Sequence, residues 1–301
     1  MFIDIHVHTR LSDFPQRDSS AGGRYATPEE LMAMLKPHGV RAVVTFARVN
    51  PECGWFVQSV EEILTAAEQY PDFIIPFMNV DPRQATNSPN SNLSYLMEHY
   101  KERGCRGIGE VCANLPFDDP LIENLFKHAE ACDLPLTFHI APEHYGYYGI
   151  RDRLGLPGLE GALRKFPDLK FLGHSQPFWA EIGGDLNEES RNTYPKGKVA
   201  EGGAVVRLMR EYPNLYGDLS AGSGHNAISR DPAFGYAFMT EFQDRLMFGT
   251  DICDPRNETP IIDFLNHAVH SGSISREVYE KISFRNAEKV LALKPGEYGT
   301  C

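Results

Sequence analysis

The feature that most constrains the fold is a regular alternation of short apolar segments with longer amphipathic ones. The short segments are rich in β-branched and aromatic residues, as strands are, whereas the longer ones have the periodicity of helices. Strict strand–helix alternation predicts a parallel sheet, and eight such units predict a closed barrel. The expected strands are FIDIHVH (2–8), RAVVTFA (41–47), FIIPFMNV (73–80), CRGIGEV (105–111), LPLTFHIA (134–141), LKFLGHS (169–175), NLYGDLS (214–220) and RLMFGTD (245–251).

The expected helices begin with TPEELMAML, where Thr27 is a suitable N-cap and Pro28 suits the first helical position. We therefore predict one α/β domain over residues 1–301, a single (β/α)8 TIM barrel. A long loop, 175–198, follows the sixth strand and is expected over the mouth of the barrel, where active sites form. The other helices are expected around 58–70, 92–103, 119–132, 157–166, 199–212, 231–242 and 258–271, with a C-terminal helix near 275–292.

Composition narrows the class of protein. The formal charge of −12 argues against nucleic acid or an anionic membrane as the main partner, since both require a basic surface. Six scattered cysteines without a CxxC pair are typical of reduced thiols, and no apolar run approaches the ~18 residues of a membrane span. Because the first residues already form a strand, we expect no signal peptide and a cytoplasmic protein that acts on a small molecule. Whether it forms a homo-oligomer stays open.

The first expected strand carries two histidines, His6 and His8, spaced two residues apart. Such residues share a face of a strand, so the two imidazoles can converge on one ion, whereas on a helix they would diverge. A half-solvated strand would also tolerate this pattern, so the pair alone decides little. Strict alternation places Ile3, Ile5 and Val7 on one face and Phe2, Asp4, His6 and His8 on the other.

Four other residues able to bind metal or move protons lie at the same ends of later strands: Glu110, His139, His174 and Asp251. As ordinary core residues, each histidine would need its own hydrogen-bond partner, and the carboxylates would be desolvated together at a cost. A divalent cation removes both difficulties. Nitrogen and carboxylate oxygen without thiolate suit Zn²⁺, and also Mn²⁺ or Fe²⁺.

Roles follow from this placement. Asp251 is expected to orient or deprotonate a metal-activated water, and His174 to act as an acid, a base or a carbonyl polariser. Asp4 either holds an imidazole tautomer or is an ordinary polar residue of the barrel floor. Glu110 is either a further ligand or base, or the partner of Arg106 in a structural ion pair.

Three residues are candidates for substrate binding. Arg10, just beyond the histidine pair, and Arg48, beyond the second strand, could receive carboxylates, although both could equally be surface arginines. His225 follows the seventh strand and could touch a ligand.

The motifs DIHVH and FGTD, the histidines of the fifth and sixth strands and the closing ISFRNAEKVLAL resemble the amidohydrolase superfamily, and more closely its amidohydrolase-related (amidohydrolase 2) branch of metal-dependent TIM-barrel hydrolases and decarboxylases. The resemblance covers nearly the whole chain in order. It implies metal ligation by His6, His8, His139 and Asp251, with His174 near the substrate. The fifth strand has no lysine at its end, which argues against a lysine-bridged pair of ions. Glu110 departs from the decarboxylase pattern and is similar to a glutamate ligand of TatD-like nucleases.

These observations favour a metal-dependent hydrolase of a small carbonyl compound, such as a lactone, amide or ester. The alternative is a non-oxidative decarboxylase of an aromatic or dienoic acid, and a non-catalytic barrel is a further one. The opening DIHVHTRLSD also resembles a polymerase-and-histidinol-phosphatase (PHP) phosphoesterase domain. Such domains usually carry an Asp-His pair after the second strand, where this chain reads VVTFARVNP.

Overall fold

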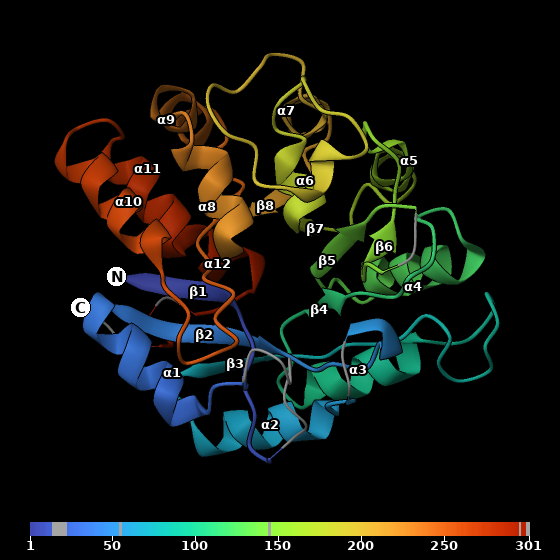
Figure 1. The fold of residues 1–301 in the computed structure, drawn as a ribbon. Helices are drawn as coiled ribbons and strands as arrows, with labels where there is room; N and C mark the ends of the chain where they lie inside the picture. The colour runs from blue at the N-terminus through green and yellow to red at the C-terminus, as the bar shows by residue number, and fades with distance from the viewer. Residues whose placement is uncertain (14–22, 54–55, 144–145, 295, 299–301) are drawn as a thin grey trace.

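The computed structural model describes residues 1–13, 23–53, 56–143, 146–294 and 296–298. Its strands alternate with helices along the chain, as the sequence predicts. Figure 1 shows the strands at the centre of the molecule and the helices around them. The strands are β1 (Phe2–Val7), β2 (Val40–Phe46), β3 (Ile74–Phe77), β4 (Ile108–Val111), β5 (Leu136–Ala141), β6 (Ile150–Arg151), β7 (Phe171–His174), β8 (Leu215–Asp218) and β9 (Leu246–Met247).

The helices match the expected ranges to within a few residues, with two additions: α6 (Gln176–Ala180), which lies in the expected loop after the sixth strand, and α8 (Ala221–Ser229). Helix α8 directly follows β8 and was not expected, because its sequence AGSGHNAIS has little apolar periodicity. The C-terminal helix is α11 and α12 joined by a π-helical turn, Lys281–Arg285. The helices are α1 (Pro28–Leu35), α2 (Val60–Gln69), α3 (Ser94–Glu102), α4 (Pro120–Ala131), α5 (Pro157–Lys165), α6 (Gln176–Ala180), α7 (Ala204–Glu211), α8 (Ala221–Ser229), α9 (Pro232–Glu241), α10 (Pro260–His270), α11 (Arg276–Glu280) and α12 (Asn286–Val290).

All the paired strands are parallel, in the orders β1-β2-β3 and β4-β5-β7-β8-β9, and β6 is a short addition to β5. Isolated parallel bridges link the two sheets on both sides, between Met78 and Ile108 and between Val7 and Ile252. Backbone hydrogen bonds at the second junction include Ile5 N–H to Phe248 C=O at 3.0 Å. The strands therefore follow one another around the molecule in chain order, as in a TIM barrel, and their carboxyl ends lie together.

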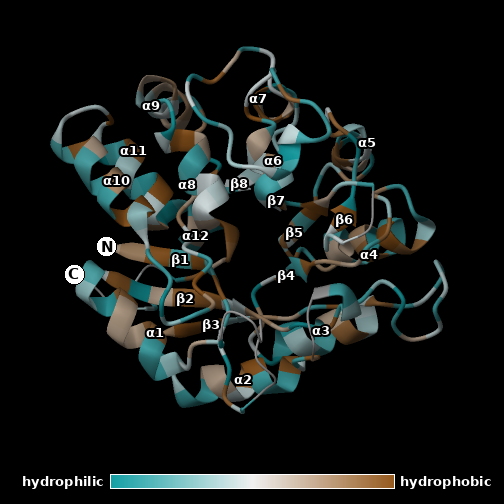
Figure 2. Cartoon of the chain, viewed as in Figure 1, coloured by the Kyte–Doolittle hydropathy of each residue, from teal (hydrophilic) through white to brown (hydrophobic). Residues whose placement is uncertain are grey.

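The capping residues at the start of α1 form the contacts that the sequence predicts. Thr27 and Glu30 form a capping box, in which the Thr27 hydroxyl accepts from the Glu30 N–H and the Glu30 carboxylate accepts from the Thr27 N–H. The strands are largely apolar, apart from the polar residues of the site, and the helices carry polar residues on the outside (Figure 2). The largest buried cluster packs the strands against the helices, so the scaffold that holds the strand ends is well packed.

Strict alternation along β1 is wrong. Phe2 and Ile3 belong to different clusters, as expected, but Val7 belongs to the cluster of Phe2 and not to that of Ile3 and Ile5. The His6 ring packs on Phe46, which belongs to the cluster of Ile5. The pairing of β1 with β2 is irregular between Asp4 and Val7. This irregularity, and not a regular period of two, brings His6 into the centre of the site.

The connection after β7 is long, as expected, but it is not a simple loop over the barrel mouth. It begins with α6, whose Phe178 and Trp179 are fully buried, and continues to a short 3-10 turn at Ser190–Asn192. Within it the buried Arg191 donates to Glu181 Oε1 at 2.6 Å and to Asp152 C=O at 2.8 Å. The first part of this segment, 175–183, is therefore part of the core, whereas most of 184–198 is exposed.

Candidate metal centre

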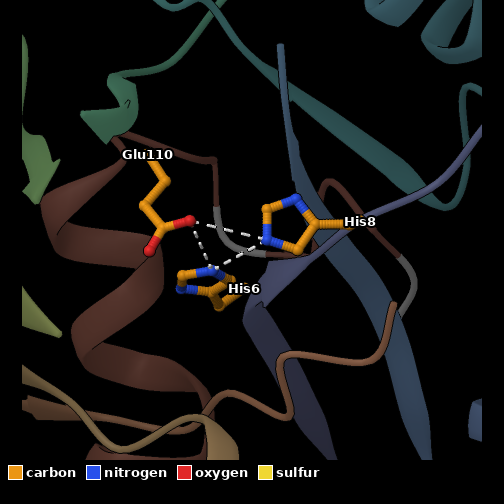
Figure 3. Close-up of side chains that lie close together, drawn as sticks. All are labelled: His6, His8 and Glu110. Atoms are coloured by element: carbon orange, nitrogen blue, oxygen red, sulfur yellow. Dashed lines mark hydrogen bonds and ion pairs between the residues drawn. The ribbon is translucent and has the colours of Figure 1, made fainter. Parts of the chain in front are cut away.

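Two histidines of the first strand meet at the carboxyl end of β1. The Nε2 atoms of His6 and His8 lie 3.3 Å apart, and both rings are buried (Figure 3). Asp251, from the segment that follows β9, places Oδ1 3.6 Å from His6 Nε2 and 3.4 Å from His8 Nε2. Hydrogen bonds from the Asp251 N–H to His6 C=O and from the His8 N–H to Ile252 C=O hold the two segments together. Three nitrogen and oxygen donors therefore converge from opposite ends of the chain.

Glu110, the third residue of β4, faces the same centre. Its Oε2 lies 3.9 Å from His6 Nε2 and 3.7 Å from His8 Nε2, and its Oε1 lies 3.7 Å from His174 Nε2. The proposed structural pairing with Arg106 is wrong, because Arg106 contacts Glu297 at 3.1 Å and is partly exposed. The positive charge that balances Glu110 therefore comes from the surrounding histidines and from any cation that they bind.

His139 on β5 and His174 at the end of β7 complete the cluster. The two rings lie 5.6 Å apart at their centroids, and each has a ring nitrogen within 4.8 Å of a Glu110 oxygen. Tyr148 stacks on His139 with the ring centroids 4.3 Å apart. All six residues that the sequence predicts at the strand ends thus lie together, as His6–His8–Glu110, His6–His174–Asp251 and Glu110–His139–His174.

The donor set fits a divalent cation by its spacing as well as its chemistry. Zn²⁺ holds nitrogen and oxygen ligands at about 2.0–2.2 Å, so ligand atoms around one tetrahedral ion lie about 3.3–3.6 Å apart. The separations among His6, His8 and Asp251 are 3.3, 3.4 and 3.6 Å. The buried carboxylate of Glu110 and the partly buried one of Asp251, next to several imidazoles, also favour a cation for charge balance. The residues therefore fit a metal ion.

The surroundings of the histidines in the cluster give their imidazoles different pKa values. Burial lowers the pKa of His8 and that of His139 to about 4, which keeps both rings neutral with a lone pair for a cation. For His6 burial acts in the same direction, but Asp218 and the other carboxylates raise its pKa to about 10. For Glu110 burial opposes ionisation, yet the surrounding histidines lower its pKa to about 2. Glu110 therefore stays ionised at neutral pH.

Sequence reasoning missed Asp218, the last residue of β8. Its Oδ2 lies 2.6 Å from His6 Nδ1 and 3.5 Å from His174 Nδ1, and the residue is fully buried. The signal was present, since Asp218 ends a strand as Glu110 and His174 do. Asp4 does not hold an imidazole tautomer. It accepts hydrogen bonds from the His6 N–H at 3.0 Å and from Thr250, and so joins β1 to the segment before Asp251.

The candidate substrate-binding residues differ in position. The Arg10 guanidinium donates hydrogen bonds to the Tyr25 carbonyl, at 2.9 Å, and to the Asp13 carboxylate. The Arg48 guanidinium lies over the rings of Tyr25 and Phe56, at 4.9 and 5.9 Å, and its charge helps to lower the pKa of His8, after the larger effect of burial.

His225, on α8, is half-buried and packs its ring against Phe264, with the centroids 5.9 Å apart. Of the three candidates, Arg48 is therefore the one whose charge acts on the cluster.

Comparison with known proteins identifies the family. The chain matches the family described as Amidohydrolase over residues 3–293, which is nearly its whole length. It therefore belongs to the amidohydrolase 2 family of metal-dependent enzymes, hydrolases and decarboxylases, as DIHVH and FGTD indicated. No sequence among the curated proteins matches the chain. In the described ranges, no helix combines the length and apolar character needed to cross a membrane.

Several solved structures share the fold at low identity. A probable 2-pyrone-4,6-dicarboxylic acid hydrolase from Acinetobacter baumannii is 14% identical, with a TM-score of 0.60 over 97% of this chain and 99% of that one. The 5-carboxyvanillate decarboxylase from Sphingomonas paucimobilis is 15% identical, with a TM-score of 0.60 over 97% and 99%. An amidohydrolase from Burkholderia multivorans with bound zinc is 15% identical, with a TM-score of 0.61 over 98% and 100%. These neighbours include both reaction types.

Proposed function

We propose that this protein is a hydrolase of a small carbonyl compound, a lactone, amide or ester, with its whole chain, residues 1–301, forming one catalytic domain. In this proposal the ligands of a divalent cation are His6, His8, Glu110, His139 and Asp251. Zn²⁺ suits the nitrogen and oxygen donors best, and Mn²⁺ and Fe²⁺ are the other candidates. When bound, the cation polarises a carbonyl oxygen and lowers the pKa of a water molecule towards about 7.

The chain itself supplies the groups that move protons. Asp251 Oδ2 would accept the proton of the attacking water, and His174 Nε2, which lies 4.0 Å from it, would donate to the oxygen that develops negative charge. Bond formation at the carbonyl carbon and departure of the alcohol or amine complete the hydrolysis. The leaving group takes up the proton that the water gave to Asp251.

The exposure of Asp251 carries this proposal. Its side chain is 25% exposed, whereas those of His6, His8, Glu110 and His174 are 9% exposed or less. A carboxylate that contacts two candidate ligands and also reaches solvent is placed to accept a proton from an incoming water. Burial raises the pKa of Asp251, but a hydrogen bond from His8 and the charge of His6 lower it further than burial raises it, so that Asp251 is ionised and able to act as a base.

One observation favours decarboxylation of an aromatic or dienoic acid as the second candidate. The Arg48 guanidinium lies over the rings of Tyr25 and Phe56 and its charge acts on His8, which suits a site that receives a substrate carboxylate. The family match gives no support to a phosphoesterase of the PHP type.

Turnover of a substrate panel by the zinc-loaded protein separates these reactions. Lactones and esters are assayed by proton release, amides by release of the amine, and aromatic and dienoic acids by release of CO2. Zinc-dependent hydrolysis without CO2 supports the proposal, whereas CO2 release from an acid supports the alternative. The double variant His6→Ala/His8→Ala is the control and is expected to lose both the metal and turnover. Saturating metal without turnover on the whole panel would indicate a non-catalytic barrel.

A further inference from the structure

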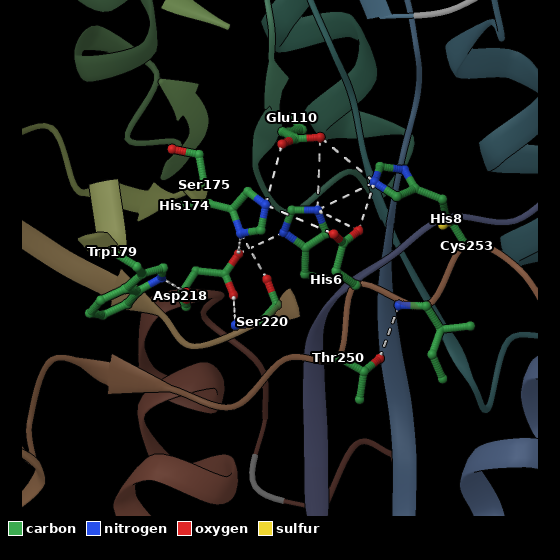
Figure 4. Close-up of polar contacts among 12 residues, drawn as sticks. His6, His8, Glu110, His174, Ser175, Trp179, Asp218, Ser220, Thr250 and Cys253 are labelled. Carbon is green, nitrogen blue, oxygen red and sulfur yellow. Dashed lines mark hydrogen bonds and ion pairs between the residues drawn. The ribbon is translucent and has the colours of Figure 1, made fainter. Parts of the chain in front are cut away.

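The end of β8 contacts two histidines of the centre by their outward-facing nitrogens. Asp218 Oδ2 lies 2.6 Å from His6 Nδ1 and 3.5 Å from His174 Nδ1, while Ser220 Oγ lies 2.9 Å from His174 Nδ1 (Figure 4). Asp218 and Ser220, two residues apart, thus lie next to the Nδ1 atoms of the two rings. The Nε2 atoms of the same rings face Glu110 and Asp251 on the other side.

This segment is itself firmly held. The Ser220 N–H donates to Asp218 Oδ1 at 3.0 Å, and the indole N–H of Trp179 donates to the Asp218 carbonyl at 2.7 Å. Gly249 of the neighbouring segment leaves the required space, because a Cβ there would lie 2.9 Å from Asp218 Oδ1 and 2.8 Å from Ser220 Cβ. With Asp218 and Ser220 both fully buried, water does not compete for these contacts.

We propose that Asp218 and Ser220 form one positioning pair that sets the orientation of His6, a candidate ligand, and of His174, the candidate proton donor. The inference rests on the function proposed above. A carboxylate only accepts, so Asp218 requires a proton on His6 Nδ1 and leaves Nε2, which gives up its own proton when a cation binds, directed at the centre. Ser220 holds the His174 ring by its Nδ1. The pair therefore couples the site that binds the cation to the residue that handles the proton.

Two variants test the roles of Asp218 and Ser220 separately. Asp218→Asn keeps the shape but removes the charge, and it is expected to lower Zn²⁺ affinity by about 10- to 100-fold, the range found for residues that support a ligand. Ser220→Ala loses only the His174 contact, so Zn²⁺ affinity should stay within threefold while kcat falls about tenfold with KM unchanged. Affinity is measured by competition with a chelator.

Asp152→Asn is the matched control. Asp152 is also a buried aspartate, but its carboxylate accepts from the N–H groups of Arg153, Gly158 and Leu159, away from the cluster. This variant should lower thermal stability and leave Zn²⁺ affinity unchanged. If Asp218→Asn behaves like Asp152→Asn, Asp218 has only a structural role and the proposal is refuted.

Nitrogen-15 NMR of the histidine rings in the unmodified protein tests the proposal even if a variant fails to fold. A proton on His6 Nδ1, present in both the metal-free and the zinc-loaded protein, supports the inference. A zinc-loaded protein in which that nitrogen carries no proton overturns it. If the unmodified protein binds no divalent metal, the proposed function fails, and the Nδ1 proton in the metal-free protein then decides separately whether Asp218 positions His6.

Discussion

Substitution of Glu110 by glutamine tests whether this residue binds the cation. The carboxylate of Glu110 lies 3.7–3.9 Å from the Nε2 atoms of three histidines, and its side chain is 9% exposed. Glutamine keeps the shape and one carbonyl oxygen but removes the negative charge. If Glu110 is a ligand, the variant must therefore lose affinity for the metal while the fold is retained.

The expected magnitude follows from the donor count. Zinc binding to structural sites is worth about 10–16 kcal/mol, so each of the five proposed ligands accounts for about 2–3 kcal/mol. The Glu110→Gln variant should thus bind Zn²⁺ roughly 30- to 160-fold more weakly. The histidines lower the pKa of Glu110 even without metal, against the effect of burial, so the metal-free variant also loses some stability. That loss is measured separately and subtracted.

Chelator competition gives the Kd directly, and urea unfolding with and without Zn²⁺ gives the same difference by linkage. When free Zn²⁺ exceeds both dissociation constants, the metal should stabilise the variant by about 2–3 kcal/mol less than the unmodified protein. Glu297→Gln is the control, because it removes the carboxylate that contacts Arg106 and touches nothing in the cluster. A Glu110→Gln variant that binds Zn²⁺ within threefold of the unmodified protein would refute the assignment of Glu110 as a ligand.

Three further outcomes are expected. Asp251→Asn should keep the fold and some metal but lose about 10²–10⁴-fold in kcat, because the amide cannot accept a proton; a near-normal rate would place the base elsewhere. Arg191→Ala should lower the free energy of unfolding by roughly 3–5 kcal/mol, since Glu181 stays buried without its partner; a loss below about 1 kcal/mol in urea unfolding would contradict this. Glu30→Gln should cost about 1 kcal/mol at pH 7, reduced for the partial exposure of this side chain. The hydrogen bond from Arg24 lowers the pKa of Glu30 from 4.5 to about 2, so the stabilisation is present above pH 4.5 and lost as pH falls towards 2. A pH-independent difference from the unmodified protein would exclude this origin, and Glu68→Gln on α2 is the exposed control.

Local patterns were sufficient to predict much of this protein. The order of strands and helices depends on periodicity and capping within about ten residues, as at Thr27 and Pro28, so it can be read from the sequence. The cluster of His6, His8, Glu110, His139, His174 and Asp251 was predicted for a related reason. Because parallel strands of a barrel share one carboxyl end, a polar residue at the end of each strand is brought to the same place.

The tertiary structure decided what depends on contacts between distant segments. The pairing of β1 is irregular, and the His6 ring packs on Phe46, which belongs to the same cluster as Ile5; no local period encodes this. The pairing of Arg106 with Glu297 crosses 191 positions, and that of His6 with Asp218 crosses 212.

Such partners are selected by the packing of the whole barrel, where Gly249 leaves room for one carboxylate beside an imidazole. The sequence by itself therefore determined which strand ends carry reactive groups. Only the tertiary structure determined which side chain orients which imidazole, because this depends on distances between residues that are far apart in the sequence.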